Sequence, residues 1–119
     1  MSTSVTRAFT FEAAHQLPWH EGKCRHLHGH SYRLEVTVTG PIGDNGIVVD
    51  FADIRRAVKA EILDRFDHTY LNDLLPNPTA ELIAADCWKR LEAAGLTVGH
   101  IRLWETADSW VDIDLTGTS

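Results

Sequence analysis

The segment KCRHLHGHSYRLEV, residues 23–36, contains one cysteine and three histidines within seven positions, from Cys24 to His30. Imidazole and thiolate groups are the usual protein ligands of zinc, and both also act as acids, bases or nucleophiles in catalysis. Residues i and i+2 of a strand lie roughly 6.6 Å apart on one face, so two such imidazoles can share an ion. The segment therefore predicts a metal site, a reactive thiol, or both.

The alternation of residues 28–39 bears on which histidines form such a pair. Apolar and polar side chains alternate there, as in a strand with one buried face, and His28 and His30 share the apolar parity. His26 would lie roughly 13 Å from His30 in a straight strand, which is too far for one ion. The pair is either His28 with His30 or His26 with His28, and the alternation favours the first.

A third histidine ends the strand expected over residues 5–15. His15 lies on the apolar parity of that strand, so pairing of the two strands would bring it close to His28 and His30. Three histidines are a typical catalytic zinc set, which leaves a fourth position for water or substrate. The alternative is that all three are polar residues at the rim of a sheet.

Two cysteines differ in their surroundings. Cys24 lies between Lys23 and Arg25, whose charges can lower the pKa of a thiol and favour the thiolate; the alternative is an exposed, inert thiol. Cys87 falls on the apolar stripe of an expected helix and is interpreted as a buried structural thiol. Both are expected to be free thiols, as in a reducing compartment.

Two carboxylates are further candidates. Asp67 and His68 are adjacent in FDHTYLN, where on a loop an aspartate can orient an imidazole and stabilise its charged form. Alternatively, His68 only lies near the C-terminal dipole of a helix. Glu105 ends a strand on its apolar face and needs a partner there. It is predicted either to anchor the N–H donors of a ligand or to form a salt bridge at the rim.

Hydrophobic periodicity predicts the elements that hold these residues. We expect strands at 5–15, 28–39, 98–105 and 109–115, a helix at 51–66, and a second helix that Asn77 or Thr79 caps and Gly95 ends. The order ββ-αα-ββ predicts one α+β domain over residues 1–119, with a four-stranded antiparallel sheet and two helices on one face. Its two sheet edges would be unpaired, which favours a homo-oligomer.

Composition narrows the possible partners. The 119 residues carry a net charge of -6 and are 44% hydrophobic, as in a globular domain that does not bind nucleic acid non-specifically. No apolar run approaches the ~18 residues that span a membrane, and the N-terminus lacks the apolar core of a signal peptide. We expect a cytoplasmic protein that binds neither nucleic acid nor membranes.

Six segments, in this order, resemble the 6-pyruvoyltetrahydropterin synthase superfamily: FTFEAAHQLP, CRHLHGHSY, VVDFADI, FDHTYLND, NPTAE and WET. The C-x3-H-G-H spacing resembles the bacterial carboxy branch, which serves queuosine synthesis. The resemblance implies the tunnelling fold and a homo-oligomer, commonly a hexamer, with active sites at subunit interfaces. It also implies that the zinc ligands are His15, His28 and His30.

The same resemblance implies roles for the other candidates. Cys24 is similar to a thiolate that moves protons on the substrate side chain, and His68 with Asp67 would complete a Cys-His-Asp relay across an interface. Glu105 resembles the residue that grips the pterin ring, sometimes also described as part of the relay. The remaining matches, close to the pterin pocket in the family, are Thr79 and Glu81.

The activity implied is a zinc-dependent lyase that converts 7,8-dihydroneopterin triphosphate to 6-carboxy-5,6,7,8-tetrahydropterin, releasing acetaldehyde and triphosphate. One alternative is the pyruvoyl branch, which usually has two more residues between the cysteine and HGH. A folate-precursor branch carries Glu where this chain has Cys24. A zinc module without turnover would not need Cys24 or His68, and a Cys-His-Asp hydrolase would need an oxyanion hole that the sequence does not reveal.

Overall fold

A single five-stranded sheet is the central element of the structure. The computed structural model describes residues 2–115. The sheet order is β3-β1-β2-β4-β5, and the strands are β1 (Thr3–His15), β2 (His28–Gly40), β3 (Thr69–Tyr70), β4 (Val98–Thr106) and β5 (Ser109–Asp114). The four predicted strands all form, with ends within two residues of the prediction. They pair in the expected antiparallel sense, β1 with β2, β2 with β4 and β4 with β5, an order that the sequence did not predict.

The two faces of the sheet differ as the period-two pattern requires. Inward-facing residues such as Phe11, Tyr32 and Leu34 are fully or almost fully buried. The opposite face is polar, and the hydroxyls of Thr6 and Thr37 lie 2.6 Å apart across the β1–β2 pair. Because side chains alternate between the faces, each strand delivers every second residue to the core.

The prediction of a four-stranded, wholly antiparallel sheet is wrong. A fifth strand, β3, pairs in parallel with Ala13 and Ala14 of β1. Two residues are too few to show a hydrophobic period, so nothing in the pattern distinguishes them from a loop. Long-range contacts place β3: the Asp67 carboxylate accepts a hydrogen bond from the Glu12 backbone N–H at 2.9 Å, and the His68 backbone N–H donates to the Glu12 carbonyl.

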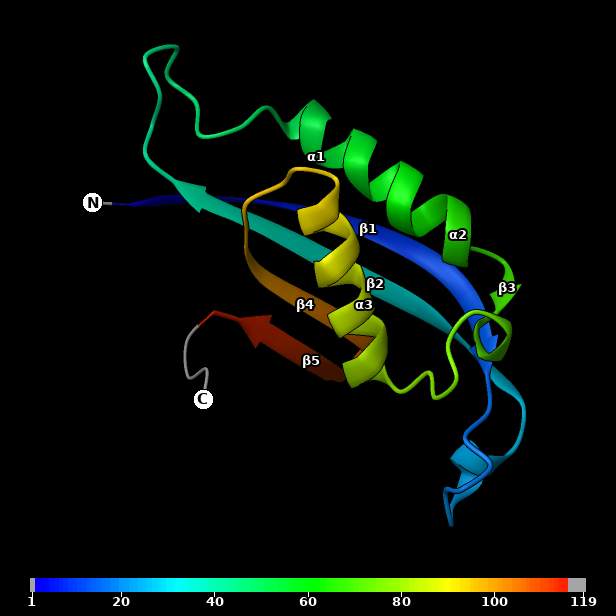
Figure 1. Ribbon diagram of the computed structural model, residues 1–119. Coiled ribbons are helices and arrows are strands. Elements are labelled where there is room, and N and C mark those ends of the chain that lie inside the picture. The colour runs from blue at the N-terminus through cyan, green and yellow to red at the C-terminus, as the bar shows by residue number, and fades with distance from the viewer. Residues whose placement is uncertain (1, 116–119) are drawn as a thin grey trace.

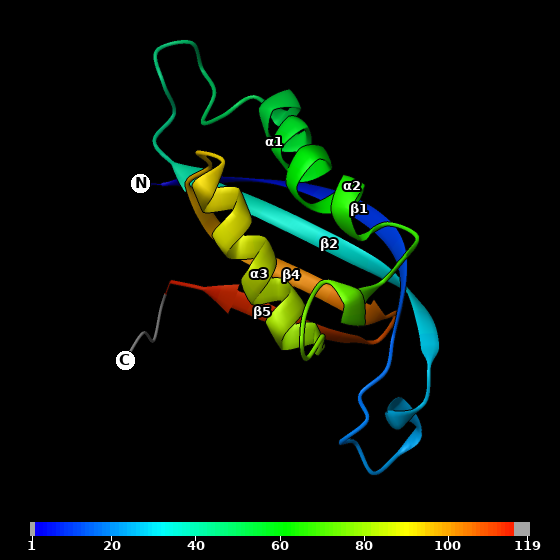
Figure 2. The ribbon, with the colours of Figure 1, turned by 45° about the vertical axis from the view of Figure 1, so that its right-hand side comes forward.

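Two helical segments cover one face of the sheet (Figures 1 and 2). The first combines α1 (Phe51–Val58), a π-helical stretch η2 (Lys59–Leu63) and α2 (Asp64–Phe66), over the range predicted for a single helix. The Asp50 carboxylate caps it by accepting from the Ala52 N–H at 2.8 Å. The π stretch was not predicted, because its residues keep the same apolar stripe as an ordinary helix.

The second helix, α3 (Ala80–Ala93), begins at a threonine cap. The Thr79 hydroxyl accepts from the Leu82 N–H at 3.1 Å, so Thr79 and not Asn77 is the capping residue. Gly95 follows the helix with φ +98°, a left-handed conformation that costs glycine little. The remaining elements are two short 3-10 turns, η1 (Lys23–Arg25) and η3 (Leu71–Asp73).

The core lies between these helices and the sheet. The helices contribute fully buried residues at spacings of four, namely Ile54, Val58, Ile62 and Phe66 in the first segment and Ile83, Cys87 and Leu91 in the second. Cys87 is a free, buried thiol, as its place on the apolar stripe predicts. Within residues 2–115, no helix is long and apolar enough to cross a membrane.

Adjacent residues of α3 provide a test of this packing. Ile83 is fully buried, whereas Leu82 is 48% exposed. We expect Ile83→Ala to lower the free energy of unfolding by about 2–5 kcal/mol, because it leaves a cavity in the core. Leu82→Ala is the matched control and should cost less than about 1 kcal/mol. Urea denaturation measures both, and equal losses would contradict the observed orientation of α3.

Candidate functional site

Three imidazoles meet where β1 ends and β2 begins. The pairing register places His15 directly opposite His28, and Ala13 opposite His30, so all three rings lie on the inner face. The ring centroids are 4.6 Å apart for His15 and His28, 4.8 Å for His28 and His30, and 5.2 Å for His15 and His30. Their nitrogens all lie within 4.8 Å of one another, so the three could hold one metal ion.

Backbone carbonyls determine which ring nitrogen carries the proton in two of these rings. The Nδ1–H of His15 donates to the Pro78 carbonyl at 2.8 Å, and the Nδ1–H of His28 donates to the His26 carbonyl at 2.7 Å. A carbonyl oxygen only accepts, so each neutral ring keeps its proton on Nδ1 and leaves a lone pair on Nε2. Metal-binding histidines are usually held in this way. Here the two Nε2 atoms lie 3.0 Å apart, and a cation would relieve the repulsion between their lone pairs.

The third ring has an unsatisfied nitrogen. Nε2 of His30 is buried and has no hydrogen-bond partner among the described residues. Burial lowers the pKa of His30; the Glu105 carboxylate raises it, and His15 and His28 lower it further. The neutral form, which metals require, is therefore favoured. Tetrahedral ligands around zinc lie roughly 3.3 Å apart, so only a small contraction is needed to close this set on an ion.

Glu105 lies beside the same cluster. Its two carboxylate oxygens are 3.9 Å from Nε2 of His15 and 3.8 Å from Nε2 of His30. The register of β4 against β5 shifts between Trp104 and Thr106, at the position of Glu105. The sequence predicted an inward carboxylate that needs a partner, and the structure supplies the imidazoles as neighbours.

Asp67 and His68 form a second group. Asp67 Oδ2 lies 3.0 Å from Nδ1 of His68, and His68 has the left-handed φ of 59°, which is uncommon outside glycine. The Glu12 backbone N–H is the main cause that lowers the pKa of Asp67, followed by its hydrogen bond with His68. Asp67 thus stays ionised while it orients the imidazole and anchors β1.

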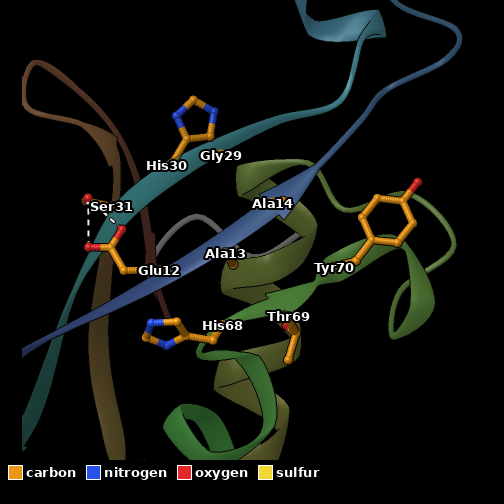
Figure 3. Close-up of a pocket in the computed structure, with 9 residues that line it drawn as sticks. All are labelled: Glu12, Ala13, Ala14, Gly29, His30, Ser31, His68, Thr69 and Tyr70. Atoms are coloured by element: carbon orange, nitrogen blue, oxygen red, sulfur yellow. Dashed lines mark hydrogen bonds between the residues drawn. The ribbon is translucent and has the colours of Figure 1, made fainter.

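An open hollow of about 520 Å³ lies beside His68. We call it the outer hollow, and its lining residues are Glu12, Ala13, Ala14, Gly29, His30, Ser31, His68, Thr69 and Tyr70. Figure 3 shows the Glu12 carboxylate turned to the Ser31 hydroxyl, which donates to it at 2.6 and 2.9 Å. In the same view the rings of His30 and His68 lie on opposite sides of the β1–β2 pair. His30 and His68 nevertheless both belong to the lining of the outer hollow.

The structure leaves the predicted relay open. Cys24 is a free, partly buried thiol in η1, within the loop that extends beyond the sheet at the β1–β2 end (Figure 1). No hydrogen bond joins it to His68 in the described part of the chain, and it does not line the outer hollow. Of the other predicted residues, Thr79 uses its hydroxyl to cap α3, and Glu81 is exposed in the first turn of that helix.

Three contributors to the site were missed by sequence reasoning. The carbonyls of Pro78 and His26 orient two rings, and the hydroxyl of Tyr32 is buried beside the cluster with no hydrogen-bond partner in the described part of the chain. A backbone carbonyl carries no residue-specific signal. The position of Tyr32 on the parity of His28 and His30 was a visible signal, but the alternation marked it only as core.

The fold is the tunnelling fold. It closely resembles a solved structure of Caenorhabditis elegans 6-pyruvoyl tetrahydropterin synthase, with a TM-score of 0.85, 22% identity and 96% of each chain covered. The sequence profile of the 6-pyruvoyl tetrahydropterin synthase family matches residues 4–115. The chain belongs to this family.

Curated relatives are more similar in sequence. The chain is 44% identical over 115 residues to the 6-carboxy-5,6,7,8-tetrahydropterin synthase of Synechocystis, with 88% of each chain covered. It is 40% identical over 104 residues to a putative enzyme of the same name from Archaeoglobus fulgidus, covering 87% of this chain and 89% of the relative. A dihydroneopterin monophosphate aldolase of Pyrococcus furiosus is 31% identical over 117 residues, covering 96% and 99%.

The histidine cluster is tested by two neighbouring substitutions. We expect His28→Ala to abolish stoichiometric metal binding, because it removes one of three converging nitrogens. His26→Ala is the matched control: it removes an exposed ring but keeps the carbonyl that orients His28. Metal content after dialysis, read by mass spectrometry, measures both. Full metal content in the His28→Ala variant would overturn the ligand assignment.

Proposed function

We propose that the chain is a zinc-dependent lyase of queuosine biosynthesis, which converts 7,8-dihydroneopterin triphosphate to 6-carboxy-5,6,7,8-tetrahydropterin with release of acetaldehyde and triphosphate. The observation that carries the proposal is the 40–44% identity, over most of the chain, to relatives that bear this name. Two features of the chain support it: three imidazoles that converge on one point, and Cys24 in the C-x3-H-G-H spacing of the carboxy branch.

In this proposal the metal is zinc, held by His15, His28 and His30. Bound zinc would act as a Lewis acid toward the side-chain hydroxyls of the substrate. The chain's own contribution is to aim the three rings: carbonyls hold the Nδ1 protons of two rings so that Nε2 is left as the ligand atom, and burial disfavours protonation of the third.

The proton transfers are assigned to Cys24 and His68. Cys24, between two cationic residues, serves as the thiolate base, and His68, oriented by Asp67, serves as its partner. The Asp67 carboxylate lies 3.0 Å from Nδ1 of this ring and orients it. We place the reaction in the cytoplasm, where reducing conditions keep Cys24 a free thiol.

In this proposal a second copy completes the relay, because no hydrogen bond joins Cys24 to His68 within residues 2–115. We propose a homo-oligomer, a hexamer by family resemblance, in which a neighbouring chain brings the missing group. The edge of β1 that faces away from β2 supports such assembly. On this side β3 pairs only with Ala13 and Ala14, and residues 3–12 have no second strand beside them in the described chain. Exposed edges of this length are usually covered by another element.

Substrate binding is assigned to the residues around α3 and the end of β4. Glu105 would accept hydrogen bonds from the N–H groups of the pterin ring with the oxygens that now face the imidazoles. Thr79 sets the start of α3, and the preceding carbonyl, that of Pro78, holds His15. Glu81 is exposed in the first turn of the same helix, where it is free to meet a ligand or a neighbouring chain.

Product analysis tests the proposal. Zinc-loaded protein is incubated with 7,8-dihydroneopterin triphosphate, and the products are read by mass spectrometry with an acetaldehyde trap. We expect the 6-carboxy product together with acetaldehyde. A 6-pyruvoyl product without acetaldehyde would assign the chain to the pyruvoyl branch. Cleavage of dihydroneopterin monophosphate would instead match the aldolase relative, and metal binding without any conversion would indicate a zinc module.

The thiol is tested separately. We expect Cys24→Ala to lower kcat by at least about 100-fold while zinc content and the fold are kept, because a positioned general base contributes roughly 10²–10⁴-fold. Cys87→Ala is the thiol control, since Cys87 is buried in α3 and has no part in the proposal. Unchanged turnover in the Cys24→Ala variant would remove Cys24 from the mechanism.

A further inference from the structure

Tyr32 has an unexplained buried polar group next to His15 and His30. It follows His30 by two residues on the inner face of β2, and its side chain is fully buried. Its hydroxyl has no hydrogen-bond partner among the described residues. Buried polar groups are nearly always paired, so an orphaned one calls for a partner that arrives with the functional state.

The ring of Tyr32 is tightly held. It stacks on Phe11 at 5.0 Å between centroids, with 13° between the planes. The rings of His30 and His15 meet it edge-on at 5.6 and 6.3 Å. The ring therefore has little freedom to move. A hydrogen-bond partner has to approach the hydroxyl from the groups beside the cluster.

The chemistry of the hydroxyl limits what it can do there. Arg33 pairs with Trp104 in the β2–β4 register, so Tyr32 and Glu105 are neighbours across these two strands. A tyrosine hydroxyl carries its proton at neutral pH and can donate a hydrogen bond. The anionic acceptor that the structure places at this cluster is the Glu105 carboxylate.

Glu105 in turn has two competing uses. Its oxygens lie 3.8 and 3.9 Å from Nε2 of His30 and His15, so an ion bound by those rings would be close to the carboxylate. If Glu105 bound the ion, four protein ligands would close the coordination sphere, as in structural zinc sites. An open fourth position needs another partner for this carboxylate.

We propose that Tyr32 is a positioning residue whose hydroxyl donates a hydrogen bond to Glu105 and keeps that carboxylate off the metal. The fourth coordination position then stays open, and Glu105 stays available to a ligand's N–H groups. This inference rests on the metal centre of the proposed function, but not on which pterin product is formed.

The test uses Co²⁺ in place of zinc, because its visible absorption reports the number and type of ligands. We expect Tyr32→Phe, which keeps the stacked ring and removes only the hydroxyl, to change this spectrum as Glu105 joins the ion. Cobalt affinity should rise about tenfold, a usual size for contacts just outside the ligands. The double variant Tyr32→Phe/Glu105→Gln should return to the wild-type spectrum, since it lacks the carboxylate.

Two controls separate this role from packing. Tyr70→Phe alters the chain's other tyrosine, which lines the outer hollow, and should leave the cobalt spectrum unchanged. Glu105→Gln alone should also leave it unchanged, because Glu105 is not a ligand in the wild-type protein. This second measurement keeps the inference testable if Tyr32→Phe does not fold.

The outcomes are distinct. If Tyr32→Phe leaves spectrum and affinity unchanged, even with a higher melting temperature, the hydroxyl is only an unsatisfied group and the inference fails. A changed spectrum in Glu105→Gln alone also overturns it, because Glu105 would then already be a ligand. If wild-type protein binds no cobalt, the metal centre itself fails, and this inference fails with it.

Discussion

The register between β1 and β2 is the constraint on which the rest of the site depends. It sets His15 opposite His28 and leaves His30 one pair further along the same face. A slip of one residue would turn the histidines of one strand to the opposite face. The buried side chains of Phe11 and Tyr32, which are paired in the same register, prevent that slip. Core packing and metal geometry are therefore specified by one alignment of two strands.

That alignment brings imidazole nitrogens together inside the protein without giving them hydrogen-bond donors from the described part of the chain. Two Nε2 lone pairs face each other at 3.0 Å, and Nε2 of His30 is buried without a hydrogen-bond partner among residues 2–115. Such an arrangement is unfavourable for folding by itself, because buried acceptors lose their water. A bound cation would satisfy all three at once. The Pro78 carbonyl, joined to His15 by a hydrogen bond, links the start of α3 to the same centre.

The second group lies at the edge of the sheet, and its geometry has a different origin. Asp67 and His68 are held by hydrogen bonds to the backbone of Glu12, the last residue of β1 before its pairing with β3. This clamp fixes His68 in a left-handed conformation and exposes its ring. An exposed, oriented imidazole, with no hydrogen bond to Cys24 within residues 2–115, is consistent with a site completed by a second chain.

Local patterns in the sequence are enough to predict the four long strands, both helices, the shared face of the three histidines and the inward direction of Glu105. All of these follow from periodicity, which repeats within each element. The short strand β3, the π stretch of the first helix, the carbonyls that orient the rings, and the lack of a hydrogen-bond partner for the Tyr32 hydroxyl within residues 2–115 arise only from the folded chain. These depend on contacts between distant segments, such as the 63 positions that separate His15 from Pro78, and no local pattern records them.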